Sequence, residues 1–145
     1  MTFTGVSYLA VFVAAVAGWL LGAGYYMALA KPWVAAHGRT TQDFKREAEA
    51  SKGTSAAWMP YLLAFIAEFV MAWVLAGLMA HLGPGQVTVW NGIVSAAFVW
   101  LGFVATTIAV NNMFSYRRPK LSVIDGGHWL AVLLVMGAIL GAFGV

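Results

Sequence analysis

The chain has 145 residues, of which 62% are hydrophobic and only 9% are charged. Soluble domains carry roughly 25% charged residues, so this composition excludes a soluble globular protein and predicts an all-α integral membrane protein. Eight Lys and Arg against five Asp and Glu give a net charge of +3, and the absence of cysteine excludes disulfides and cysteine-ligated metals. Because about 20 residues form one membrane-spanning helix, residues 1–145 are predicted to be a single domain of four transmembrane helices.

The first transmembrane helix is predicted over residues 6–30. Small residues recur at every fourth position along it, at Ala10, Ala14, Gly18 and Gly22. Such a row lets another helix backbone approach closely, so it predicts a helix-packing seam. Residues 28–30 resemble a signal-peptide cleavage site, but the apolar run before them is too long and no Lys or Arg precedes it. A retained helix is therefore predicted, and Lys31-Pro32 is expected to end it.

The connection over residues 31–57 is the longest in the predicted fold, and it carries five of the eight basic residues. Within it, residues 40–50 predict a short surface helix, because Thr40 can cap a helix that has Asp43 in its first turn. A solvated helix is the simpler interpretation. Contact with anionic lipid or with a partner protein is the alternative.

The second transmembrane helix is predicted over residues 58–81, and it contains one carboxyl group, Glu68, near its middle. A central acid costs an inserting helix roughly 3 kcal/mol, so its presence requires an explanation. The helical row through Glu68 is otherwise small, with Ala64, Ala72 and Ala76. Because rows of small residues face protein in membranes, Glu68 is predicted to point into a bundle or an oligomer interface.

The third and fourth transmembrane helices are predicted over residues 87–114 and 122–144. On the third, one arc is small or polar throughout, with Asn91, Ser95, Gly102, Thr106, Ala109 and Asn112. Thr107 and Asn111 lie opposite this arc, so protein is expected on two sides of the helix. On the fourth, Asp125 and His128 share one face. Gly137 and Gly141 lie on another face and form a GxxxG pair, a helix-association motif.

The basic residues predict an orientation, because loops rich in Lys and Arg stay in the cytoplasm. Five basic residues lie in the first connection, three in the third and none in the second. The two basic loops are therefore expected in the cytoplasm and both termini on the non-cytoplasmic side. The chain is predicted to be a multi-pass protein of the bacterial inner membrane.

The predicted depths of several polar side chains in the membrane indicate a candidate polar site. Counting a rise of 1.5 Å per residue from the cytoplasmic ends places Glu68 and Thr106 about 15 Å deep and His128 about 10 Å deep. The candidate residues are Glu68, Thr106, His128, Asp125, Asn111, Asn112 and Tyr25. They predict either a proton or cation path or a pocket for a small polar solute, with Glu68 at its centre.

The alternative interpretation of these residues is structural. Glu68 is then protonated, because burial disfavours its charged form, and it hydrogen-bonds Thr106 or a backbone carbonyl. Asp125 is then an acid in the first turn of a helix, stabilised by the helix dipole and paired with Arg117 or Arg118.

No cofactor, metal or nucleic acid is expected. The three histidines lie at very different predicted depths, so one metal or haem site built from them is not expected. The sequence has no glycine-rich phosphate loop and no Gly-x-Ser-x-Gly motif. Because the basic residues are confined to two loops, their arrangement favours an orientation signal over nucleic-acid binding.

The chain also resembles a family of bacterial proteins. The residues that carry the resemblance are Gly22, Tyr26, Lys31, Trp33, Gly102-Phe103, Thr106-Thr107, Asn111, Phe114, Arg117, Leu121, Ile124-Asp125, Gly127 and Met136-Gly137-Ala138-Ile139-Leu140. They are similar to the pattern of domain-of-unknown-function family 1761. The resemblance covers most of the chain and implies a small four-helix membrane protein, but it implies no activity.

Three classes of function follow. The leading prediction is a structural or accessory subunit that homo-oligomerises or docks on a larger membrane complex through the seams of the first and fourth helices. The alternative is a small channel or carrier in which Glu68 binds a proton or cation. A membrane-embedded enzyme would need Asp125 and His128 to work as an acid-base pair, and it is not expected.

Overall fold

Four long helices run through residues 6–144, the part of the chain that the computed structural model describes. They are α1 (Tyr8–Ala28), α4 (Met59–Ala80), a run formed by α5 (Val89–Val99), the π-helix η2 (Trp100–Ala105) and α6 (Thr106–Phe114), and α7 (Pro119–Phe143). All four are long and apolar enough to cross a membrane, and no strand is present in the described residues. The prediction of an all-helical chain with four such helices is confirmed.

Two shorter helices and one 3-10 turn connect α1 to α4. They are α2 (Ala30–Ala36), α3 (Thr41–Ser51) and the 3-10 turn η1 (Ser55–Ala57). The prediction that Lys31-Pro32 ends the first helix is wrong in detail, since the helix breaks at Leu29 and resumes at once as α2. Pro32 then lies in the first turn of α2, where a missing backbone N–H costs nothing because that group has no partner within the helix.

The starts of the helices follow from local chemistry. The hydroxyl of Ser7 accepts from the backbone N–H of Ala10 at 3.3 Å, and the hydroxyl of Thr88 accepts from that of Asn91 at 3.2 Å. These side chains cap α1 and α5 by satisfying N–H groups that have no partner inside the helix. Helices α4 and α7 carry proline in their first turn, where its fixed φ suits a helix start.

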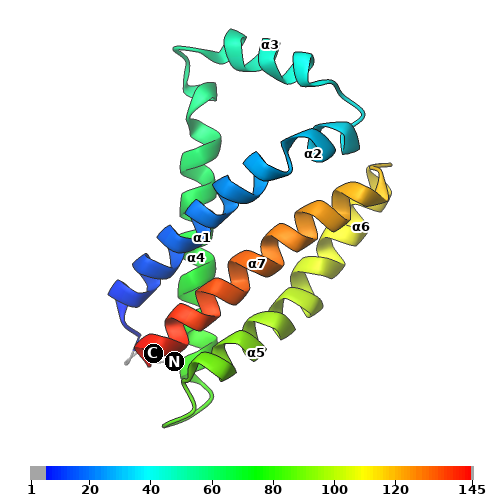
Figure 1. The fold of residues 1–145 in the computed structure, drawn as a ribbon. Coiled ribbons are helices and arrows are strands. Elements are labelled where there is room, and N and C mark those ends of the chain that lie inside the picture. Colours follow the sequence, from blue (N-terminus) through cyan, green and yellow to red (C-terminus); the bar gives the residue numbers. More distant parts are fainter. Residues whose placement is uncertain (1–5, 145) are drawn as a thin grey trace.

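Helix α7 packs against both α1 and the α5–α6 run, while α4 packs against α1 and crosses behind it in Figure 1. The largest fully buried side chains come from α1, α4 and α7: Val11, Leu75, Met79, Val132, Leu133, Met136 and Leu140. The helices therefore share one apolar core, and α7 has neighbours on both of its predicted faces.

Glycines on α7 set the distance to α5. A Cβ atom added at Gly137 would collide with the backbone carbonyl of Gly92, and one added at Gly92 would collide with the carbonyl of Gly137. One turn later on α7, Gly141 meets the backbone of Thr88 in the same way. The predicted GxxxG pair thus packs inside the chain, against α5.

The π-helix η2 changes which residues of the third long helix face protein. Asn91 and Ser95, before it, are half-buried, whereas Gly102, Thr106 and Ala109 are exposed. A π-helix holds more residues per turn than an α-helix, so the arc counted at 100° per residue does not stay on one side. The prediction of protein on two sides of this helix is not met within the described chain.

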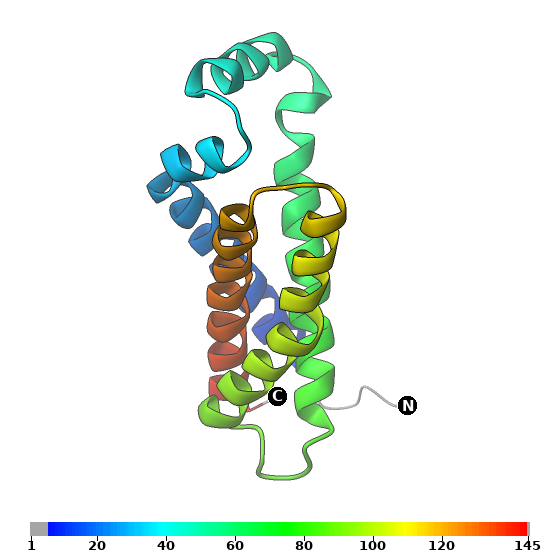
Figure 2. The ribbon, with the colours of Figure 1, turned by 90° about the vertical axis from the view of Figure 1, so that its right-hand side faces the viewer.

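All eight Lys and Arg residues lie toward one end of the molecule, with α2, α3 and the connection between α6 and α7 (Figure 1). We call this the basic end. Figure 2 shows the connection between α4 and α5 at the opposite end. On α3, Thr40 and Asp43 form the predicted capping box, and the hydrogen bonds from Thr40 hold the pKa of Asp43 below its ordinary value.

Candidate functional site

Two glycines on α1 leave space for two polar side chains from other helices. A Cβ atom at Gly18 would lie 2.7 Å from Oε2 of Glu68, which comes from α4, and 3.1 Å from Cγ1 of Val132. A Cβ atom at Gly22 would lie 2.7 Å from Nε2 of His128, which comes from α7. The carboxyl and the imidazole therefore lie against the bare backbone of α1 on consecutive turns.

Both side chains are buried and incompletely paired. Glu68 is 3% exposed and His128 is 4% exposed. Neither Oε2 of Glu68 nor Nδ1 of His128 has a hydrogen-bond partner among the described residues. Because most buried polar atoms in native proteins are hydrogen-bonded, each exception requires an explanation.

A network of aromatic and acidic side chains surrounds His128 on the side of the basic end. The Tyr26 hydroxyl donates to Oδ1 of Asp125 at 2.9 Å, and Nε1 of Trp33 donates to the same oxygen at 3.1 Å. The rings of Tyr26 and His128 lie 4.7 Å apart, and the rings of Tyr25 and His128 lie 5.6 Å apart. Asp125 thus holds α1 and α2 against α7, with Tyr26 between this carboxyl group and His128.

Polar groups therefore continue from the basic end into the core. We call Asp125, Tyr26, His128 and Glu68 the polar column. Past Glu68, toward the opposite end, the buried side chains on α1, α4 and α7 are apolar: Ala10, Val11, Ala14, Ala72, Leu75, Ala76, Met79, Met136 and Leu140. Within the described chain the polar column starts at the basic end and stops at Glu68.

Four of the seven predicted site residues meet here, namely Glu68, His128, Asp125 and Tyr25. The Tyr25 hydroxyl contributes by donating to the carbonyl oxygen of Ile124 at 2.9 Å. It also fills the space beside Gly127, where an added Cβ would lie 2.8 Å from it. Both contacts tie the end of α1 to the second and third turns of α7.

The other three predicted residues lie elsewhere, on the α6 segment. Thr106 is exposed and donates to the carbonyl oxygen of Gly102 at 2.9 Å, so it does not supply the hydrogen bond expected for Glu68. Asn111 is exposed. Asn112 donates to the hydroxyl of Ser122 at 3.0 Å. The bonds of Thr106 and Asn112 tie α6 to the preceding π-helix η2 and to the start of α7.

The predicted pairing of Asp125 with Arg117 or Arg118 is replaced by the bonds from Tyr26 and Trp33. Helix α7 begins at Pro119, earlier than predicted, so Asp125 lies beyond its first turn. Arg118 instead donates to the carbonyl oxygen of Ala35 at 2.9 Å. An arginine of the connection between α6 and α7 is therefore bound to α2.

Sequence reasoning named Tyr26 and Trp33 only as residues that carry the family resemblance, so it missed their hydrogen bonds to Asp125. It also placed Gly18 and Gly22 in a packing seam without relating them to a polar side chain. One feature of the sequence could have indicated this contact: the two glycines lie at a depth similar to that of a carboxyl group and a histidine. Helix order, which the sequence does not contain, was needed to join them.

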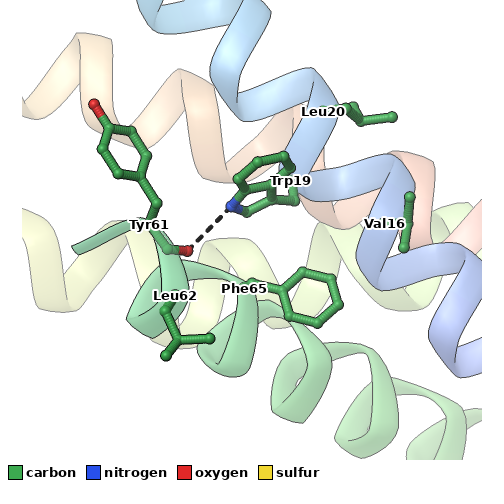
Figure 3. A pocket seen from close by; sticks show the side chains of 6 residues that line it. All are labelled: Val16, Trp19, Leu20, Tyr61, Leu62 and Phe65. Atoms are coloured by element: carbon green, nitrogen blue, oxygen red, sulfur yellow. Dashed lines mark hydrogen bonds between the residues drawn. The ribbon is translucent and has the colours of Figure 1, made fainter. Parts of the chain in front are cut away.

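The described residues contain no group of three or more His, Cys, Asp or Glu side chains that could hold a metal ion. One groove of about 350 Å³ lies between α1 and α4, lined by Val16, Trp19, Leu20, Tyr61, Leu62 and Phe65 (Figure 3). Nε1 of Trp19 donates to the carbonyl oxygen of Tyr61 across it at 3.2 Å. Its lining is apolar, and Glu68 is not part of it.

Comparison with known proteins assigns the chain to a family without a described activity. The family model described as protein of unknown function (DUF1761) matches residues 9–141. No curated protein and no solved structure matches the chain.

Proposed function

The chain belongs to the DUF1761 family of proteins of unknown function, and we propose that it is a non-enzymatic, small proton- or cation-linked channel or carrier. Its central binding group is Glu68. The observation that carries this proposal is the Glu68 carboxyl group, buried in the core with Oε2 unpaired among the described residues. Ionisable groups within membrane helices are costly, and they mark ion and proton pathways in many transport proteins.

The glycine contacts argue against assembly through the predicted packing seams, and so they favour the transport proposal. Gly18 and Gly22 on α1 face Glu68 and His128, and Gly137 and Gly141 on α7 face α5. Ala10 and Ala14 are fully buried. Because these residues are covered by the chain's own helices, they offer no free surface to a partner.

We also propose the membrane in which the protein lies and its orientation there. Four long apolar helices, with every basic residue at one end, suit a bacterial inner-membrane protein whose basic end lies in the cytoplasm and whose termini lie outside. The polar column then reaches Glu68 from the cytoplasm. The apolar core past Glu68 closes the site toward the other side, as in a carrier that faces one side at a time.

Glu68→Gln tests the proposal, because it keeps the shape of the side chain and removes its charge. In liposomes under an imposed ion gradient, the variant is expected to lose flux by at least about tenfold, equivalent to about 1.4 kcal/mol on the barrier. Flux of protons, sodium and potassium is measured separately. Glu49→Gln is the matched control, since Glu49 is an exposed carboxyl on α3 paired with Lys52. Equal flux in the native protein and Glu68→Gln rejects the proposal.

A second candidate function, assembly, is favoured by the exposed side of the α5–α6 run. Gly102, Thr106 and Asn111 are exposed there, and a Cβ atom at Gly102 would meet nothing within 4 Å. Small and polar residues on a membrane helix promote contact with another helix. This surface supports a homo-oligomer, or docking on a larger membrane complex.

Gly102→Leu tests the assembly candidate. We expect the substitution to reduce the mass of the native particle, measured after gentle extraction, to that of a single chain. Gly24→Leu is the control, because Gly24 is also exposed on a long helix with nothing within 4 Å of an added Cβ. A particle mass that is the same in the native protein and in both variants counts against assembly through this surface.

A further inference from the structure

We infer that His128 and Glu68 act in series as a proton-transfer pair, so that the ion handled by this site is the proton. The inference rests on the proposed function and narrows it from protons or cations to protons alone. It also assigns a direction, in which protons from the basic end reach His128 first and Glu68 second.

The placement of the two groups along α1 is the first argument. Glu68 lies against Gly18 and His128 lies against Gly22, and residues four apart on one helix face are separated by about 5–6 Å between their Cβ positions. Each group presents one buried atom without a partner, Oε2 of Glu68 and Nδ1 of His128. The two groups thus lie about one helical turn apart along α1, a span over which bridging water molecules can join two polar side chains.

The second argument is that the site offers few atoms that could bind a metal cation. Hard metal cations in proteins are bound by about six or more oxygen atoms. Here the Glu68 carboxyl group lies among apolar atoms, Cγ1 of Val132 and Cε of Met136 beside Gly18, and His128 adds one imidazole. A proton needs only one lone pair at each stop, and these two side chains supply that.

Titratable groups face His128 from the helices packed around it. Tyr25 and Tyr26 face it from α1, Asp125 lies one turn earlier on α7, and Glu68 comes from α4. Asp125 accepts the Tyr26 hydrogen bond, which fixes its carboxyl group close to the ring. Burial disfavours an imidazolium ion, and a carboxylate nearby offsets part of that cost; the imidazolium ion is the form His128 takes after accepting a proton.

The proton transfer from His128 to Glu68 conserves atoms and charge. In the tautomer that carries its proton on Nε2, Nδ1 of His128 uses its lone pair to form an N–H bond with a proton from a hydronium ion at the basic end; the O–H bond of that ion breaks, and water and an imidazolium ion result. That N–H bond then breaks, its electrons return to nitrogen, and an O–H bond forms at the carboxylate of Glu68. The products are a neutral imidazole and a neutral carboxylic acid, so no metal, oxidant or reductant is required.

Chemical rescue of His128→Ala tests the relay. Proton flux into liposomes with an entrapped pH-sensitive dye is expected to fall by at least about tenfold. Added imidazole, which fills the vacated space and accepts protons, is expected to restore it. Pyrazole has nearly the same shape but is a far weaker base, so it is expected to restore nothing. Imidazole also carries protons across lipid by itself. Rescue is therefore measured as the proton flux of His128→Ala with imidazole minus the flux of a His128→Ala, Glu68→Gln double variant with imidazole.

Two results would overturn the relay directly. Unchanged proton flux in His128→Ala excludes a proton-accepting role, and equal rescue by imidazole and pyrazole shows that His128 only fills space. Sodium or potassium flux that depends on Glu68, without proton flux, leaves the proposed function standing and removes the relay. Absence of flux for all three ions rejects the proposed function and the relay with it.

If His128→Ala does not give a homogeneous particle, His128→Gln and infrared spectroscopy decide the question. The carbonyl band of the protonated Glu68 acid is identified by its loss in Glu68→Gln. In the native protein this band is expected to titrate in two coupled steps, because interacting groups share their titration. In His128→Gln a single step is expected. Identical titrations in the two proteins overturn the relay.

Discussion

Gly137→Ala is expected to force α5 away from α7 and to lower the free energy of unfolding by about 3 kcal/mol. The added Cβ atom would collide with the carbonyl group of Gly92 and lie 3.0 Å from Cβ of Ala96. A backbone carbonyl cannot rotate away as a flexible side chain can, so the two helices must separate. Overpacking a well-packed core costs about 1–3 kcal/mol, occasionally more, and a backbone collision belongs at the upper end.

Thermal unfolding in one detergent, followed by near-ultraviolet circular dichroism, measures this loss. Gly24→Ala is the matched control, because Gly24 also lies within a long helix but an added Cβ would meet nothing within 4 Å. Alanine favours the helix over glycine by up to about 1 kcal/mol, so the control should be slightly stabilised. Equal stability of Gly137→Ala and the native protein would contradict the close contact of α5 with α7.

Glu68→Met is expected to act in the opposite direction and to stabilise the protein by about 1–3 kcal/mol. This is the usual cost of burying a polar group without a hydrogen bond, and methionine removes the polar atoms while keeping a flexible chain of similar length. The neighbours are already apolar or bare, namely Gly18, Val132 and Met136. Under the proposed function, the same substitution abolishes flux.

The comparison with Glu68→Gln sharpens this test. Glutamine keeps a polar amide in the same position, so it should gain less stability than methionine when both are unfolded by heat in the same detergent. A lower unfolding temperature for Glu68→Met than for the native protein would mean that the carboxyl group makes a stabilising contact. A more stable but inactive variant is the pattern expected when a group is kept for function at a cost in stability.

The sequence predicted the four long helices because each one is a long apolar stretch with local start signals. It predicted the Thr40 capping box for the same local reason. It placed Glu68 and His128 at depths that agree with one polar column, since depth depends only on the rise per residue along a helix. These features are contained in short stretches of chain.

The partners of those groups could not be predicted, because they depend on which helices are neighbours. Thr106 is at the same predicted depth as Glu68, yet α6 contacts α7 and the α4 carboxyl group lies against α1. The π-helix η2 added a second obstacle, because it turns the residues after Trp100 to a different side than an uninterrupted α-helix would. A periodicity count is valid only while the period stays constant.

The contact of Gly22 with His128 also constrains the order in which the two residues could have arisen. A Cβ atom at position 22 would lie 2.7 Å from Nε2 of the histidine ring, so the ring and any larger residue at position 22 compete for one volume. A lineage that gained the histidine first would have passed through an overpacked intermediate. A lineage that gained the glycine first would have met no such overpacking. Glycine at position 22 is therefore the substitution that makes room for the histidine.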